Sequence, residues 1–114
     1  MPVLKIQTNL SVPRQQAGAV LRDASASAAQ ALRKPERYVV AILEADTPMT
    51  FGGTSEPAAY LELKSIGLPR DRTAELSRKL TDMLASGLSI APERIYIEFT
   101  DVQRDLWGWN GGTF

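Results

Sequence analysis

Pro2 is the residue with the most distinctive chemistry in this chain. A small second residue normally allows removal of the initiator methionine, which would leave Pro2 as a free secondary amine that its ring holds rigidly. A free α-amino group titrates at about 7.7 to 8.0, and burial lowers its pKa by disfavouring the charged form. A buried Pro2 amine would therefore suit a general base near neutral pH. The alternative is that Pro2 only assists methionine removal.

The composition excludes several classes of catalytic and binding site. The chain has no cysteine and no histidine, which excludes disulfides, thiol catalysis, zinc sites of the Cys/His type and histidine-based triads; we expect no metal. Thirteen basic residues balance thirteen acidic ones without a long run of either sign, so we expect neither a nucleic-acid nor a membrane surface. No signal peptide or membrane-spanning segment is recognisable, so the expected location is cytoplasmic.

The first half of the chain predicts a strand, a helix and a second strand. Leu4 and Ile6 alternate with polar residues over residues 2–8, which is the period of a half-buried strand. Apolar residues recur at helical spacing over residues 14–33, and Lys34-Pro35 ends that helix because the residue before proline avoids the α region. Residues 38–43 are almost all apolar or β-branched, which we interpret as a central, buried strand.

The second half repeats this order. A strand is expected over residues 58–66, a helix over 70–87 and a strictly alternating strand over 95–100. Pro35-Glu36-Arg37 recurs as Pro92-Glu93-Arg94. We therefore expect a single domain over residues 1–114, with pseudo-repeats at about 2–44 and 58–101 and a tail at 102–114. The connecting loop carries Met49 and Phe51, which we expect the core or another subunit to cover.

Two strand–helix–strand units determine the expected fold class. Strands that flank a helical crossover should be parallel, so the units predict an α+β sandwich: a four-stranded mixed sheet with two helices on one face. One layer of helices leaves the other sheet face uncovered, which favours oligomers whose sheets face a shared interior. The residues expected on that face are Tyr60, Glu62, Lys64, Tyr96 and Glu98.

The tail is rich in aromatic residues. Trp107, Trp109 and Phe114 would be exposed apolar surface unless the tail docked somewhere. They would line or close a pocket, pack on a neighbouring subunit, or complete the core.

Short motifs occur along the entire chain in one recognisable order and spacing. They are Pro2 before a strand ending in Thr8-Asn9, Lys34-Pro35, Phe51-Gly52-Gly53 with Ser55-Glu56-Pro57, Ser65-Ile66-Gly67, Pro92 with Arg94-Ile95-Tyr96-Ile97, and Gly108-Trp109-Asn110 with Thr113-Phe114. By these motifs the chain resembles the macrophage migration inhibitory factor (MIF) family of the tautomerase superfamily. The resemblance implies the tautomerase fold and a homotrimer with active sites at subunit interfaces. It also implies phenylpyruvate tautomerase activity, the keto–enol conversion of a small aromatic α-keto acid without a cofactor, and dopachrome tautomerase activity as a further reaction.

The resemblance assigns a catalytic set. Pro2 matches the base that moves the proton, and Lys34 matches the lysine that binds the substrate carboxylate. Tyr96 matches an aromatic residue that reaches Pro2 from a neighbouring subunit. Two structural alternatives stay open, because Lys34 could cap a helix C-terminus and Tyr96 could be an interface packing residue.

The remaining matches form the expected substrate-binding wall. Ile66 matches a position that contributes its backbone N–H, with Lys64 and Ser65 beside it. Trp109 and Phe114 match an apolar rim that stacks on the substrate ring and desolvates the amine.

Three departures from the animal members of the family alter this expectation. Residues 58–61 lack the Cys-x-x-Cys motif, which excludes thiol redox activity. Glu98 stands where those members have asparagine, and its carboxylate would favour a protonated Pro2 and repel an anionic substrate unless Glu98 is neutral or paired with Lys64. Lys64 itself replaces a histidine, and a second cation would offset Glu98. We predict retained but altered activity.

Two other function classes stay open. A MIF-like cytokine mimic would bind a host receptor, which the sequence does not name, and would reach it by non-classical secretion. A small-molecule-binding module of the same fold would not depend on the state of the N-terminus, whereas a tautomerase would lose activity if Met1 were retained.

Overall fold

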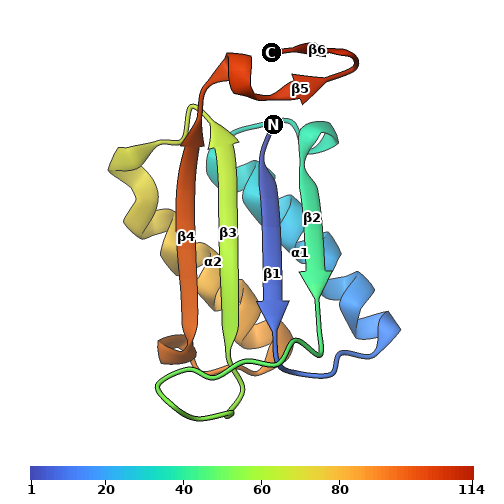
Figure 1. The fold of residues 1–114 in the computed structure, drawn as a ribbon, viewed down its shortest axis with the longest axis vertical. Coiled ribbons are helices and arrows are strands. Elements are labelled where there is room, and N and C mark those ends of the chain that lie inside the picture. The colour runs from blue at the N-terminus through green and yellow to red at the C-terminus, as the bar shows by residue number, and fades with distance from the viewer.

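A mixed four-stranded sheet forms the centre of the computed structural model, which describes residues 1–114 (Figure 1). The strand order is β2-β1-β3-β4; β1 pairs with β2 and β3 with β4 in parallel, while β1 and β3 are antiparallel. Both helices cover one face of the sheet, so the predicted α+β architecture is confirmed. The strands are β1 (Val3–Thr8), β2 (Val40–Glu44), β3 (Ala59–Ile66) and β4 (Ile95–Val102).

The two helices bury their apolar stripes against the sheet. Helix α1 (Arg14–Leu32) places mainly alanines there, and small side chains allow close approach. Helix α2 (Thr73–Leu88) buries four leucines spaced by four residues, as a single helical face requires. A short 3-10 turn, η2 (Arg70–Arg72), precedes α2, so this helix begins later than predicted. The buried leucines of α2 are Leu76, Leu80, Leu84 and Leu88.

Strand β2 is an edge strand, and its expected central position was wrong. Ala41 and Leu43 face the helices, whereas Val40 and Ile42 lie on the other face and are 50% and 39% exposed. A strand with apolar residues on both faces is expected to be covered on both faces, but within this chain helix α1 covers only one face of β2. The strand is therefore half-buried within this chain.

The second sheet face carries no helix; we call it the open face (Figure 1). Strand alternation places Lys5, Glu62 and Lys64 on it, opposite Leu4, Leu61 and Leu63, which are fully buried. The tail folds as a 3-10 turn, η4 (Arg104–Leu106), and a small hairpin of β5 (Gly108–Trp109) and β6 (Gly112–Thr113). Neither helix combines the length and the hydropathy that a membrane span requires, and no three acidic side chains gather into a metal-binding group.

Candidate active site

The amino terminus lies at the end of the sheet that the tail hairpin covers (Figure 1). Here the chain forms a hollow of about 290 Å³, the N-terminal hollow. Its wall is mostly apolar because aromatic tail residues meet the start of β1 and the segment before β2. The lining residues include Met1, Val3, Tyr38, Trp107, Trp109 and Phe114.

Three aromatic rings form the rim of this hollow. Trp109 stacks on Phe114 at a centroid distance of 5.4 Å, and Tyr38 meets both rings edge-on at 5.9 and 6.1 Å. Tyr38 is placed there by a 3-10 turn, η1 (Glu36–Tyr38), which follows Pro35. Trp109 remains 53% exposed, so the rim has free ring surface for a flat ligand.

Pro2 is buried and does not line the hollow itself, although its neighbours Met1 and Val3 do. Its carbonyl oxygen accepts a hydrogen bond from the Val40 N–H at 3.1 Å. The terminal amine present here belongs to Met1. Burial lowers the pKa of that amine below its usual value of 8.0, and the cation of Lys34 lowers it further. The surroundings of Met1 thus favour a neutral terminal amine, and removal of Met1 would move the free amine one residue along the chain, to Pro2.

Lys34 reaches this site because α1 ends sharply. Arg33 adopts a left-handed conformation, and the Lys34 N–H closes the helix on the Ala29 carbonyl at 3.0 Å. The Lys34 ammonium then lies 4.0 Å from where a Cβ on Gly67 would be. Gly67 has a φ of +66° and follows Ile66 at the end of β3, so Lys34 and Ile66 border the same corner of the fold.

Lys64 and Ser65 point to opposite sides of β3. Ser65 is fully buried on the helix side, where its hydroxyl donates to the Ile66 carbonyl at 3.1 Å. Lys64 is exposed on the open face and pairs in register with Val3. Only Lys64 of these two side chains is therefore accessible from the open face.

Tyr96 lies near the other end of the sheet, whereas Glu98 lies nearer its middle, at the level of Lys5. Gln7 pairs with Tyr60, and Tyr60 with Tyr96, so five residues of β1 separate Pro2 from the level of Tyr96. At about 3.3 Å per residue this is roughly 16 Å. Tyr96 is 65% exposed, and its ring packs on Phe51 at 4.7 Å. Within one chain, Tyr96 does not contact Pro2.

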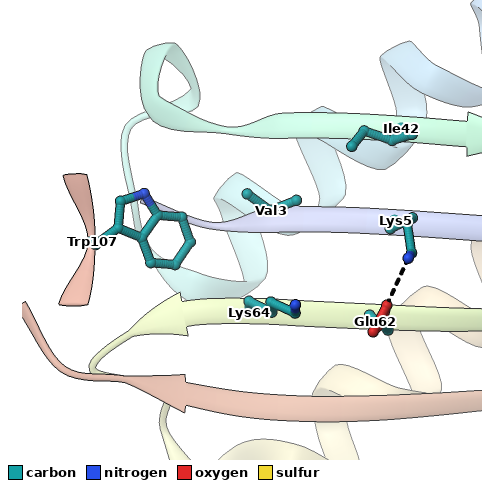
Figure 2. A pocket seen from close by; sticks show the side chains of 6 residues that line it. All are labelled: Val3, Lys5, Ile42, Glu62, Lys64 and Trp107. Atoms are coloured by element: carbon teal, nitrogen blue, oxygen red, sulfur yellow. Dashed lines mark ion pairs between the residues drawn. The ribbon is translucent and has the colours of Figure 1, made fainter. Parts of the chain in front are cut away.

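The open face contains the only ion pair of the chain, between Lys5 and Glu62 at 3.0 Å. The hydrogen bond that the Lys5 ammonium donates to the Glu62 carboxylate (Figure 2) lowers the pKa of Glu62 and raises the pKa of Lys5. Glu98 forms no ion pair with Lys64 within the chain. Its charge acts instead on Tyr60, whose pKa is raised first by burial and then by the Glu98 carboxylate.

Arg94 holds the loop that carries Phe51. Its guanidinium donates to the carbonyls of Pro57, Phe51 and Glu56 at 2.9, 3.1 and 3.0 Å, and to Thr54 at 3.4 Å. It also lies 5.1 Å from the centre of the Phe51 ring. Because Phe51 packs on Tyr96, this clamp also defines the surroundings of Tyr96.

Comparison with known proteins identifies the family of this chain. The family model described as "Macrophage migration inhibitory factor (MIF)" matches residues 1–114. The chain belongs to the MIF family. A MIF of Meriones unguiculatus is 38% identical over all of this chain and 99% of its own length, and a MIF homologue of Brugia malayi is 39% identical over the same shares.

Solved structures of MIF homologues show the same fold. A homologue from Prochlorococcus marinus has a TM-score of 0.93 and 42% identity, covering 98% of both chains. The MIF of Trichinella spiralis has a TM-score of 0.90 and 36% identity, covering 98% of this chain and 99% of its own. The tautomerase fold is therefore shown for the whole chain.

The MIF fold brings together part of the predicted site. Pro2, Lys34, Ile66, Trp109 and Phe114 gather at the amino-terminal end of β1. Sequence reasoning missed Tyr38 as a residue that lines the N-terminal hollow, and it gave Trp107 no site role beyond the expectation that the aromatic tail would line or close a pocket. Tyr38 was interpreted as the start of a strand, although the recurrence of Pro35-Glu36-Arg37 at Pro92-Glu93-Arg94 was a usable signal, since both motifs form 3-10 turns.

Proposed function

We propose that this MIF-family protein is a phenylpyruvate-type tautomerase that interconverts the keto and enol forms of aromatic α-keto acids. The observation that carries the proposal is the partly buried amine of Met1, whose pKa is lowered by burial and by Lys34, at a hollow with an aromatic rim. A neutral terminal amine can accept a proton from the substrate, and the Lys34 cation can bind the substrate carboxylate. The aromatic rim can stack on the substrate ring.

In the proposed reaction, Pro2 becomes the terminal amine after Met1 is removed. Lys34 binds the substrate carboxylate, and Trp109, Phe114 and Tyr38 hold the aromatic ring. The Pro2 nitrogen removes a proton from the carbon next to the carbonyl and returns a proton to the carbonyl oxygen, so the enol forms without net loss of a proton. The backbone N–H of Ile66 would donate a hydrogen bond to the substrate at this corner.

We further propose a homotrimer, because one chain supplies only part of this site. Tyr96 is exposed at a distance from Pro2 of its own chain, and the open face leaves Val40 and Ile42 uncovered. A neighbouring subunit would cover that face and bring its own Tyr96 and Glu98 toward Pro2. Analytical ultracentrifugation gives the oligomeric state directly.

The test compares two proteins that intact mass shows to lack Met1: the wild type and Pro2→Gly. We expect the variant to convert phenylpyruvate far more slowly, because glycine keeps a terminal amine but loses the rigid secondary amine. A third protein that retains Met1 should also be slow, since Met1 lies in the N-terminal hollow. An inactive Met-free wild type would refute the proposal. It would favour the alternative suggested by relatives named macrophage migration inhibitory factor, a cytokine mimic that binds a receptor.

A further inference from the structure

The last turn of α1 is capped by a side chain from outside the helix. Arg72, the final residue of η2, donates a hydrogen bond from its guanidinium to the Ala31 carbonyl at 2.8 Å. The carbonyls of Ala29 and Gln30 in the same turn already accept bonds from backbone N–H groups. Arg72 is half-buried and places its positive charge at the carboxyl end of α1, which is the negative end of the helix dipole.

The chain offers two cations for this helix end, and the structure gives the capping role to the side chain of Arg72. The ammonium of Lys34 forms no hydrogen bond and no ion pair within the chain. It lies instead beside Gly67, 4.0 Å from where a Cβ would be. Because Arg72 occupies the Ala31 carbonyl, Lys34 keeps its three N–H donors for an acceptor from outside the chain.

One connection controls both side chains. It joins β3 to α2, begins at Gly67 and ends at Arg72. Gly67 lies against the Lys34 ammonium at one end, and Arg72 holds α1 at the other. Between them, Leu68 is buried in the core and its N–H donates to the Asp101 carboxylate at 3.1 Å. The connection is therefore fixed between its two contacts with the end of α1.

We infer that Arg72 is a positioning residue for substrate binding: it caps α1 and so leaves the Lys34 ammonium free to bind the substrate carboxylate beside Gly67. The inference rests on the proposed function, in which Lys34 holds that carboxylate. Without Arg72, the uncapped Ala31 carbonyl and the helix dipole draw the Lys34 ammonium back to α1. Arg72 makes its one side-chain hydrogen bond to α1, so it acts on the substrate through Lys34.

The first test measures phenylpyruvate kinetics of Met-free Arg72→Met, which keeps an apolar stem but loses the charge and the donors. KM should rise by roughly three- to tenfold while kcat stays within about twofold, because the carboxylate is bound equally in the ground state and the transition state. Arg72→Ala should give the same split, and Arg72→Lys, which can still donate to the Ala31 carbonyl, should keep most of the wild-type KM. Urea denaturation shows that each variant is folded under the assay conditions.

The matched control is Arg70→Met. It removes an exposed arginine of the same 3-10 turn, and both kinetic constants should stay at the wild-type values. An equal rise of KM in this control, or a fall in kcat without a rise in KM for Arg72→Met, would overturn the inference.

A double variant decides whether Arg72 acts through Lys34. Arg72→Met should have no further effect on KM in a protein that already carries Lys34→Gln, because the ammonium that Arg72 keeps free is then absent. If the two rises in KM multiply in the double variant, Arg72 acts independently of Lys34 and the inference is wrong.

A binding measurement separates this inference from the catalytic proposal. Phenylacetate and phenylacetamide have similar shapes but differ in charge, and the fluorescence of Trp107 and Trp109 reports their binding at the N-terminal hollow without turnover. Arg72→Met should weaken the binding of phenylacetate by roughly three- to tenfold and leave that of phenylacetamide unchanged. Equal weakening of both ligands, or of neither, would overturn the inference whether or not the protein is a tautomerase.

Discussion

Replacing Arg94 by alanine should destabilise the fold through a single loop. The guanidinium makes three hydrogen bonds of 2.9 to 3.1 Å and one of 3.4 Å to carbonyls between Phe51 and Pro57. At a net value of about 0.5 to 1 kcal/mol for each of the three short bonds, and a similar amount for the contact with Phe51, the free energy of unfolding should fall by about 2 to 4 kcal/mol. The carbonyls that lose Arg94 are partly exposed, so water can hydrogen-bond to them in the variant and limits the loss of stability.

The assay is urea denaturation at a fixed protomer concentration, because association would otherwise change the apparent stability. Arg94→Ala should also lower Tm by roughly 10 to 15 °C. Arg94→Lys, which keeps the charge but not the planar fork, should lose about half as much. Arg78→Ala on the exposed side of α2 is the matched control and should stay within about 0.5 kcal/mol of the wild type.

A loss below about 0.5 kcal/mol for Arg94→Ala would refute this account of the loop. It would mean that Asn9, which donates to the carbonyls of Ser55 and Glu56 at 3.2 and 3.0 Å, holds the loop without help from Arg94.

Two further predictions concern charges at the proposed site. Lys34→Gln should shift the rise of kcat/KM with pH to higher pH, because the base must be neutral to accept a proton and the Lys34 cation contributes to the lowered pKa of the terminal amine. A pH–rate profile of Met-free protein checks this; an unshifted profile would contradict the role given to Lys34. Glu98→Asn should lower the pKa of Tyr60 only in part, since burial is the larger cause of its rise. Ultraviolet titration of tyrosine measures it, and in the proposed trimer the same variant should lower KM for phenylpyruvate; if rate and pH dependence both stay the same, Glu98 is not part of the site.

Much of the fold could be predicted because local periodicity and topology agree. Leu4 and Ile6 alternate as a strand and are fully buried, and the leucines of α2 form one stripe. The position of β2 could not be predicted in this way. The apolar side chain of Val40 indicates that its face of β2 is covered, but the sequence of one chain does not say whether a helix or another subunit covers it.

The candidate site was predictable only where its residues belong to motifs. Lys34 and Trp109 occur in such motifs, and the structure places them near the amino terminus. Tyr38 depends on a turn of three residues, and Trp107 on how the tail folds back, so neither has a periodic signal. The register that sets Tyr96 apart from Pro2 depends on the antiparallel pairing of β1 with β3, which local patterns do not determine.

Strand β1 is synthesised first but lies in the interior of the sheet, between β2 and β3. During translation the β1-α1-β2 unit emerges first, and one edge of β1 stays unpaired until residues 59–66 follow. An unpaired strand edge can pair with another chain, so aggregation competes with folding at this stage of synthesis. The same arrangement has a practical consequence: both termini lie beside the N-terminal hollow, so an affinity tag at either end begins at the candidate active site.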